Sequence, residues 1–211
     1  MARILDSTTA DYLETVRPEV DDLLLEMEAH AREERVPIAA REVAQLQAQL
    51  ARSTGAERVL EIGTAIGYST IQVARAGPAV VTLERDPERI AAAEEYLRRA
   101  GVDDRVTIRE GDALETLAEL EGPFDLVFID ALKTEYSAYL DAVVPLLADA
   151  GVVVADNLLW DGEVPAATVG DAEADEATVA LAAFNEAFVD HDDLDAIVTP
   201  LGDGTGIGVK R

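Results

Sequence analysis

Between Arg58 and Ala155, short apolar runs rich in β-branched residues alternate with segments whose apolar residues recur at helical spacing. Short apolar runs predict buried strands, and repeated strand–helix units at this spacing predict an α/β fold with a doubly wound parallel sheet. Predicted strands are Arg58–Ile62, Ala79–Glu84, Val106–Glu110, Phe124–Ile129 and Val152–Ala155, and predicted helices are Tyr68–Ala76, Pro87–Ala100, Ala113–Leu120 and Glu135–Leu147.

Helices are expected before this core. Asp11 to Arg35 has helical periodicity, with Pro18 as a break into two helices and an N-cap within Ser7-Thr8-Thr9. Pro37 opens a further helical stretch through Leu50. We therefore expect one domain over residues 1–211, with a helical extension over 1–55 and the core over 56–211.

After the fifth strand, Glu176–Val189 predicts a helix and the chain ends in two further strands, Leu194–Pro200 and Gly206–Lys210. The turn at residues 202–205, Gly-Asp-Gly-Thr, suits a hairpin between them. The sheet is therefore expected to have seven strands, with the last one antiparallel.

Composition excludes several classes of protein. The 211 residues contain no cysteine, which excludes disulfides, thiolate metal sites and a cysteine nucleophile. No apolar stretch approaches the roughly 20 residues of a membrane span, and no signal-peptide hydrophobic segment opens the chain, so no membrane partner and a cytoplasmic location are expected. The 43 acidic and 17 basic residues give a net charge of −26. This charge repels nucleic acid, but acids spread over an intact core pattern also fit a halophilic source, where salt screens them.

The turn after the first strand runs from Glu61 through Gly63 and Gly67 to Ser69. Its glycines follow a G-x-x-x-G spacing, whereas a dinucleotide-binding turn requires G-x-G-x-x-G. Glycines let a ligand approach the backbone, and an acid two residues before the first glycine suits an ammonium group better than a pyrophosphate. The turn alone is also common as a purely structural feature.

Two later strand ends extend this pocket. Glu84 ends the second strand, where an acid can accept both hydroxyls of a ribose. Asp112 and Ala113 follow the third strand, where they could meet an adenine edge, although Asp112 could equally cap a helix. An amino acid, a ribose and a purine together predict S-adenosylmethionine.

Polar residues also follow the fourth and fifth strands. Asp130 and Lys133 follow one strand, and Asp156 and Asn157 follow the next. Ligands in open α/β sheets bind at the carboxyl ends of strands, and three oxygen ligands there suit Mg²⁺ or Ca²⁺ rather than zinc. Lys133 is one of two lysines in the chain, and a lysine beside acids is a candidate general base.

The chain resembles the cation-dependent class I O-methyltransferases, a Rossmann-like family that includes the catechol and caffeoyl-CoA enzymes, and it looks closest to the small bacterial branch that methylates 5-hydroxyuridine in tRNA. The resemblance covers nearly the whole chain. It is carried by Val36-Pro37-Ile38, the stretch 59–69, Glu84, Gly111-Asp112-Ala113, the stretch 128–133, Asp156-Asn157 and the stretch 200–204.

The resemblance implies a role for each candidate residue. Asp130, Asp156 and Asn157 would bind the metal, and Lys133 would take the proton from the substrate hydroxyl. Tyr68 would lie against the sulfonium, and Ile38 would close over the methionine end. The set that would hold the cofactor comprises Ile38, Glu61, Gly63, Tyr68, Ser69, Glu84, Asp112, Ala113 and Asp130, the last also counted as catalytic.

The methyl acceptor stays open at this point. A catechol or similar phenol and the 5-hydroxyuridine of tRNA both offer the neighbouring oxygens that a chelating Mg²⁺ requires. Trp160 could wall a planar substrate or simply pack in the core. A non-catalytic binder of the cofactor is the alternative of another class, and it would need neither Lys133 nor the metal ligands. A homodimer is expected from the apolar faces of the N-terminal helices.

Overall fold

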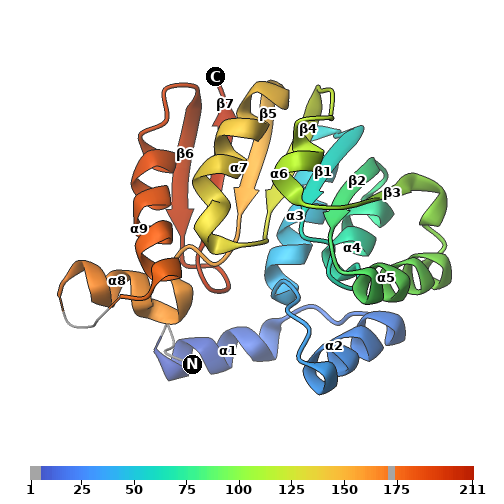
Figure 1. Ribbon diagram of the computed structural model, residues 1–211. Coiled ribbons are helices and arrows are strands. Elements are labelled where there is room, and N and C mark those ends of the chain that lie inside the picture. Colours follow the sequence, from blue (N-terminus) through green and yellow to red (C-terminus); the bar gives the residue numbers. More distant parts are fainter. Residues whose placement is uncertain (1–5, 171–173) are drawn as a thin grey trace.

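A computed structural model describes residues 6–170 and 174–211 of the chain. It contains a seven-stranded sheet with the order β3-β2-β1-β4-β5-β7-β6 (Figure 1). Neighbours among the first five strands are parallel, and β7 runs antiparallel to both β5 and β6. The α/β, Rossmann-like fold with an antiparallel last strand is thereby confirmed.

Most strand bounds agree with the predicted ranges. The strands are β1 Arg58–Ile62, β2 Ala79–Glu84, β3 Val106–Glu110, β4 Phe124–Ile129, β5 Leu147–Ala155, β6 Leu194–Thr199 and β7 Thr205–Lys210. The helices are α1 Ser7–Val16, α2 Asp22–Glu34, α3 Arg41–Thr54, α4 Tyr68–Ala76, α5 Pro87–Ala100, α6 Ala113–Leu117, α7 Tyr136–Val143, α8 Glu163–Thr168 and α9 Glu176–Val189. Short 3₁₀ turns cover Asp103–Arg105, Lys133–Glu135, Val144–Leu146 and Trp160–Gly162.

Helices cover both faces of the sheet, which explains why β4 and β5 are apolar at successive positions towards their carboxyl ends. One core contains side chains from α3, α4 and α5, among them Val43, Ile71 and Leu97. The core on the other face contains side chains from α7 and α9, among them Leu140 and Phe184. Figure 1 shows α7 and α9 in front of the sheet and α3 and α4 behind it. A parallel strand buried on both faces must be apolar at successive positions, as β4 is.

Within the described part of the chain, aspartate residues are the N-caps of five helices, α1, α2, α5, α6 and α9. Each accepts a hydrogen bond from a backbone N–H in the first turn, which satisfies a donor that the helix itself leaves unpaired. In α1 this cap is Asp6, which accepts from the Thr9 backbone at 3.1 Å. The prediction of an N-cap within Ser7-Thr8-Thr9 was wrong, because these residues already form the first turn. The other aspartate caps are Asp21, Asp86, Asp112 and Asp175.

Several boundaries differ from the prediction. Pro18 separates α1 from α2 as expected, but α3 begins at Arg41 rather than at Pro37, and α6 ends at Leu117 rather than at Leu120. The segment 37–40 is not helical, and Pro37, Ile38 and Ala39 line a cavity instead. The helix predicted over Glu135–Leu147 ends its α-helical part at Val143, followed by a 3₁₀ turn that contains Pro145. Proline has no N–H to continue the helical ladder, so the chain turns there into an early start of β5.

The N-terminal helices α1 and α2 lie across one end of the sheet in Figure 1. Helix α1 exposes Tyr12, Leu13 and Val16, and the exposed fraction of Tyr12 reaches 64%. This apolar face is the one on which the expected homodimer depends, and the dimer stays a prediction. Among the helices of the described residues, none has the length and apolar character needed to cross a membrane.

Candidate functional site

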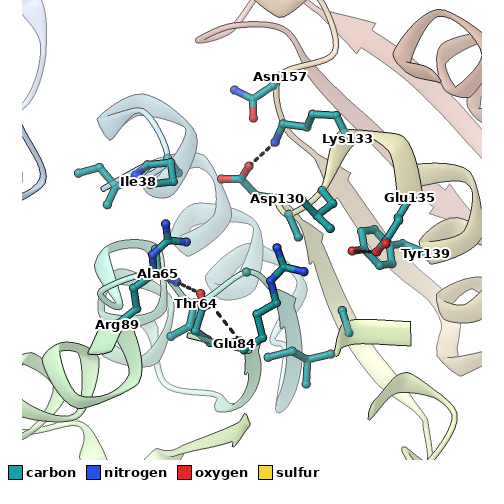
Figure 2. Close-up of a pocket in the computed structure, with 18 of the residues that line it drawn as sticks. Ile38, Thr64, Ala65, Glu84, Arg89, Asp130, Lys133, Glu135, Tyr139 and Asn157 are labelled. Atoms are coloured by element: carbon teal, nitrogen blue, oxygen red, sulfur yellow. Dashed lines mark hydrogen bonds and ion pairs between the residues drawn. The ribbon is translucent and has the colours of Figure 1, made fainter. Parts of the chain in front are cut away.

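A cavity of about 630 Å³ opens at the carboxyl ends of β1, β2 and β4, where the predicted site residues follow the strands (Figure 2). Of the residues expected to bind cofactor, metal or substrate, all but Glu61 and Asp156 line it. Those on the wall are Ile38, Gly63, Tyr68, Ser69, Glu84, Asp112, Ala113, Asp130, Lys133, Asn157 and Trp160.

The tip of β1 is in direct contact with the end of β4. Gly63 has φ +103°, and a Cβ atom placed on it would lie 2.1 Å from the carbonyl oxygen of Asp130. The Asp130 backbone N–H in turn donates to the carbonyl of Ile62 at 2.9 Å. Only glycine allows this approach, because any side chain would overlap the neighbouring backbone. The turn that would meet the cofactor and the strand end that carries Asp130 therefore form one rigid edge.

Glu61 is fully buried behind this turn and does not line the cavity. Its carboxylate accepts hydrogen bonds from the hydroxyls of Ser69 at 2.5 Å, Thr82 at 2.7 Å and Thr70. Burial raises the pKa of Glu61, and the three hydroxyls oppose that rise. Ser69, by contrast, lines the cavity. A contact of Glu61 with a ligand would therefore pass through the Ser69 hydroxyl.

Glu84 lies at the opposite end of the cavity from Asn157 in Figure 2. Its two carboxylate oxygens accept from three backbone N–H groups, those of Ala65 at 2.9 Å and of Arg85 and Asp86 at 3.0 Å each. These bonds fix the carboxylate at the cavity wall. Oε1 accepts two of these bonds and Oε2 only one, so Oε2 keeps acceptor capacity for a further donor, such as a ribose hydroxyl.

Asp112, a predicted site residue, lines the cavity beside Ala113 and also caps α6 through the backbone N–H of Leu114 at 3.0 Å. The wall also contains residues that sequence reasoning missed. Tyr139, on α7, donates to the Glu135 carboxylate at 2.5 Å, and both line the cavity. Arg85 and Arg89 line it as well. Only the topology brings α7 next to the third strand end, so the order along the chain gave no signal for Glu135 or Tyr139.

Lys133 lies on the cavity wall with its amino group held by two partners. Its Nζ donates to Asp130 Oδ1 at 2.8 Å and to the Tyr136 hydroxyl at 2.8 Å. The Tyr136 hydroxyl donates in turn to the backbone carbonyl of Asp156 at 3.1 Å. The exposed fraction of the Lys133 side chain is 12%, and its Nζ lies 5.9 Å from the Trp160 ring centroid. These contacts hold a partly buried amine at a defined position beside a carboxylate.

Asp156 is buried directly behind this wall, with an exposed fraction of 2%. Its side chain accepts from the Asn157 backbone N–H at 2.8 Å. Burial, and then the negative charge of Asp130, raise the pKa of Asp156 to about 8. Burial also raises the pKa of Asp203, a half-buried acid close to the Asn157 side chain. Asn157 therefore has acidic neighbours whose charged forms are disfavoured, with Lys133 as the neighbouring cation.

The loop that begins with Asn157 is held by the turn between β6 and β7. The backbone N–H of Leu158 donates to Gly204 at 2.8 Å, and that of Leu159 donates to Asp203 at 3.0 Å. Asn157 itself has φ +62°, a left-handed conformation that asparagine tolerates. These bonds set the direction in which the loop leaves β5.

The donor set at this rim suits a hard cation. Asp130, Asp156 and Asn157 supply two carboxylates and one amide oxygen, which are ligand types of Mg²⁺ and Ca²⁺. Residues 6–170 and 174–211 hold no cluster of three or more carboxylate, imidazole or thiol side chains arranged for a metal. That finding leaves the predicted triad untested, since its third member is an amide. The residues fit a cation chemically because one would neutralise the adjacent carboxylates.

A sequence model of the O-methyltransferase family matches residues 14–211 of the chain. Among curated proteins, the catechol O-methyltransferase of Mycobacterium tuberculosis is 46% identical over 151 residues, which cover 70% of this chain and 66% of the relative. The catechol O-methyltransferase of Niastella koreensis is 43% identical over 127 residues, covering 57% and 56%. The matches thus span less than two thirds of the length of these two relatives.

Solved structures match over almost the whole chain. An O-methyltransferase from Bacillus cereus in complex with SAH is 29% identical, with a TM-score of 0.84 and 97% of each chain covered. The O-methyltransferase TomG from Streptomyces achromogenes, in complex with SAM, is 29% identical, with a TM-score of 0.83, and covers 100% of this chain and 99% of its own.

Proposed function

The chain belongs to the O-methyltransferase family, and from this premise we propose that it transfers the methyl group of S-adenosylmethionine to a hydroxyl oxygen of a catechol-like small molecule, with the help of a divalent cation. The observation that carries the proposal is a single cavity that runs from Glu84, fixed by backbone N–H groups, to the amine of Lys133, fixed by Asp130 and Tyr136. A methyl donor and a base can therefore share one enclosed space.

The bound cofactor would supply the methyl group. The chemical character of the wall residues matches the separate groups of the cofactor. Ser69 directs its hydroxyl hydrogen at Glu61, so its oxygen is left to accept from an ammonium group in the cavity. Glu84 can accept from ribose hydroxyls, and Asp112 and Ala113 border the space for the purine. Tyr68 also lines the cavity, and its ring face would favour the positively charged sulfonium.

Asp130, Asp156 and Asn157 are the residues that would hold the cation. A bound Mg²⁺ would lower the pKa of the substrate hydroxyl and help to orient neighbouring oxygens. A bound cation would also stabilise the ionised carboxylates. Its charge would offset the mutual repulsion of Asp130 and Asp156 and the cost of burying the charge of Asp156. The Asn157 side chain lies on the cavity wall, so the triad has a member that faces the substrate.

Lys133 is the proposed general base. A neutral amine has two N–H donors and one lone pair, and two directions around Nζ are occupied by Asp130 and Tyr136. The remaining direction is free for the lone pair to receive the proton of the substrate hydroxyl. Asp130 then stabilises the lysine cation that forms. A general base in such a position contributes a factor of about 10² to 10⁴ to the rate.

The proposed acceptor is a small phenol rather than RNA. Both curated relatives reported above are catechol O-methyltransferases. Leu132 and Trp160 add apolar surface to the wall beside Lys133, which suits a planar ring. Methylation of 5-hydroxyuridine in tRNA would use the same chemistry and is kept as an arm of the test.

The test is a methyl-transfer assay with labelled S-adenosylmethionine, in the presence of Mg²⁺ or of EDTA. The buffer should contain molar KCl, because the acidic composition predicts a high-salt source. Catechols and hydroxyuridine-containing tRNA are offered in parallel. Label that enters a catechol only when Mg²⁺ is present is the expected result. Label in tRNA alone would overturn the acceptor, and equal label in EDTA would overturn the role of the cation.

A further inference from the structure

We propose that Glu28, a residue of α2 outside the main cavity wall, is a positioning residue for the methionine portion of the cofactor. The inference rests on the proposed function, since it assumes that S-adenosylmethionine occupies the cavity. Glu28 is joined to two parts of that wall, one at the start of α4 and the other just before α3. No sequence motif pointed to it, because its partners are far away along the chain.

The contacts of Glu28 are short and directed. Its carboxylate accepts two hydrogen bonds from Arg41, at 2.9 Å from Nε and 2.6 Å from Nη2. The same carboxylate accepts the Tyr68 hydroxyl at 2.6 Å. The exposed side-chain fractions of Glu28 and Arg41 are 20% and 17%, so the pair is partly shielded from water. A two-pronged arginine–carboxylate pair with a third donor fixes orientation more strongly than a single surface ion pair does.

Both partners belong to the cavity wall or adjoin it. Tyr68 opens α4 and lines the cavity together with Gly63 and Ile38. Arg41 opens α3 and directly follows the non-helical segment 37–40, of which Pro37, Ile38 and Ala39 line the cavity. The methyl group must reach a hydroxyl near Lys133 while the ribose lies near Glu84, so the sulfonium would fall between these ends. Tyr68 directly precedes Ser69, the residue proposed to meet the ammonium, and both line the cavity, so Tyr68 is a candidate neighbour of the methionine portion.

A second, more open cavity adjoins the polar group of Glu28 and Arg41. It has a volume of about 500 Å³, and Pro37, Ile38, Ala39 and Tyr68 line both cavities. Glu28 and Arg41 line the second cavity. Tyr68 and Ala39 are themselves buried in the core. The hydrogen bonds of Glu28 therefore add a directional restraint to a wall that packing already supports, and they fix the Tyr68 hydroxyl in particular.

The chain offers a matched control on the same helix. Glu26 also forms a two-pronged pair with an arginine, Arg99 of α5, at 2.7 and 2.6 Å. Neither Glu26 nor Arg99 is among the residues that line the two cavities. Loss of the Glu26 pair should therefore affect the attachment of α2 without moving the cavity wall.

The experiment compares E28Q, Y68F and E26Q by isothermal titration calorimetry with S-adenosylmethionine, S-adenosylhomocysteine and adenosine, without added metal. We expect E28Q to weaken binding of the first two by about tenfold, and Y68F by about threefold, as the loss of hydrogen bonds to a charged group implies. Adenosine lacks the methionine portion, so its affinity should stay unchanged in both variants. E26Q should match the wild type for all three ligands.

Two results would overturn the inference. One is an E28Q protein that binds S-adenosylmethionine as tightly as E26Q does. The other is an E28Q protein that loses affinity for adenosine in equal measure, since that pattern would indicate a general loss of structure. Thermal melting of each variant, run alongside, confirms that the folded protein is titrated. A wild type that binds neither cofactor form would instead overturn the proposed function, and this inference with it.

Discussion

Two buried carboxylates near the cavity, Glu61 behind β1 and Asp156 at the end of β5, lie in opposite kinds of surroundings. Both are almost inaccessible to water, and burial raises the pKa of each. Glu61 accepts hydrogen bonds from three hydroxyl groups. Asp156 accepts one backbone N–H, and the charge of Asp130 raises its pKa further. The protein satisfies Glu61 by itself, whereas the charge of Asp156 is left largely uncompensated.

The difference separates a structural acid from one suited to a ligand. A buried carboxylate with too few hydrogen-bond donors destabilises the folded protein. Such a group is typical of functional sites, where a bound ligand offsets this cost. The surroundings of Glu61 need no ligand, and its hydroxyl donors in turn fix Ser69 on the cavity wall. The surroundings of Asp156 would be completed by a cation. The four predictions below test this contrast, from the largest expected effect to the smallest.

Replacement of Lys133 by methionine removes the amine beside Asp130 and leaves the shape of the wall similar. We expect the rate of methyl transfer to catechol to fall by about 10² to 10⁴, the usual contribution of a general base. The assay is steady-state turnover with labelled cofactor at saturating Mg²⁺. Affinity for S-adenosylhomocysteine, measured by calorimetry, should stay near that of the wild type. Full turnover in this variant would remove Lys133 from the mechanism.

Replacement of Glu61 by alanine deprives the hydroxyls of Ser69, Thr70 and Thr82 of their shared acceptor. The free energy of unfolding should fall by about 3 kcal/mol, because buried donors lose their partner and a cavity is created. Urea denaturation measures this change. Glu61→Gln keeps the volume and one acceptor oxygen, so it should cost less than half as much. Equal stability of the alanine variant and the wild type would show that the three hydroxyls find other acceptors.

Replacement of Asp156 by asparagine should raise the free energy of unfolding when no cation is present, in contrast to the replacement of Glu61. The pKa of Asp156 is raised to about 8 from an ordinary value of 3.8. Its contribution to the stability of the folded state is therefore complete below the ordinary value and is lost as the pH rises to about 8. At pH 8 we expect Asp156→Asn to be more stable than the wild type by about 2 kcal/mol, well below the full shift because the surroundings relax.

Thermal melting between pH 4 and 8, with and without Mg²⁺, checks this prediction. The difference between the two proteins should shrink towards pH 4, where the wild-type carboxyl is protonated. Added Mg²⁺ should stabilise the wild type at pH 8 and leave the asparagine variant nearly unchanged. A variant less stable than the wild type at every pH would mean that Asp156 is compensated within the protein after all, and the contrast with Glu61 would disappear.

Replacement of Ser69 by alanine is the mildest change. It removes one of the three donors to Glu61 and the acceptor proposed for the cofactor ammonium. We expect a loss of about 1 kcal/mol in stability and a loss of similar size in the binding free energy of S-adenosylmethionine, as for a typical hydrogen bond. Adenosine binding, which does not involve the ammonium, serves as the control. Unaltered cofactor affinity would place the ammonium elsewhere in the cavity.

The sequence was sufficient for most of the fold, because apolar periodicity and turn residues act locally. The bounds of β1, β2, β3, β4, α4, α5 and α9 agree with the predicted ranges. The predicted start of α3 was wrong, because residues 37–40 are not helical and Pro37, Ile38 and Ala39 line the cavity instead. Helix propensity and the position of Pro37 did not indicate this.

The candidate site was predictable where residues directly follow strands, because parallel strands end at one edge. Glu84, Asp130 and Asn157 were found in this way, and all three line the cavity. Glu28 and Tyr139 could not be found, since α2 and α7 reach the cavity only through packing between helices. Trp160 lines the cavity as anticipated, but its role towards a substrate stays a prediction.

The contact between Gly63 and the carbonyl of Asp130 also bears on how relatives of this chain could diverge. It joins the turn proposed for the methyl donor to the strand end proposed for the acceptor, backbone to backbone. Substitutions in the loop after Asn157, which contributes Trp160 to the wall, can therefore change which molecule is admitted, while the distance the methyl group travels stays the same. A new substrate preference can evolve at one edge of the cavity without the reaction having to be rebuilt at the other.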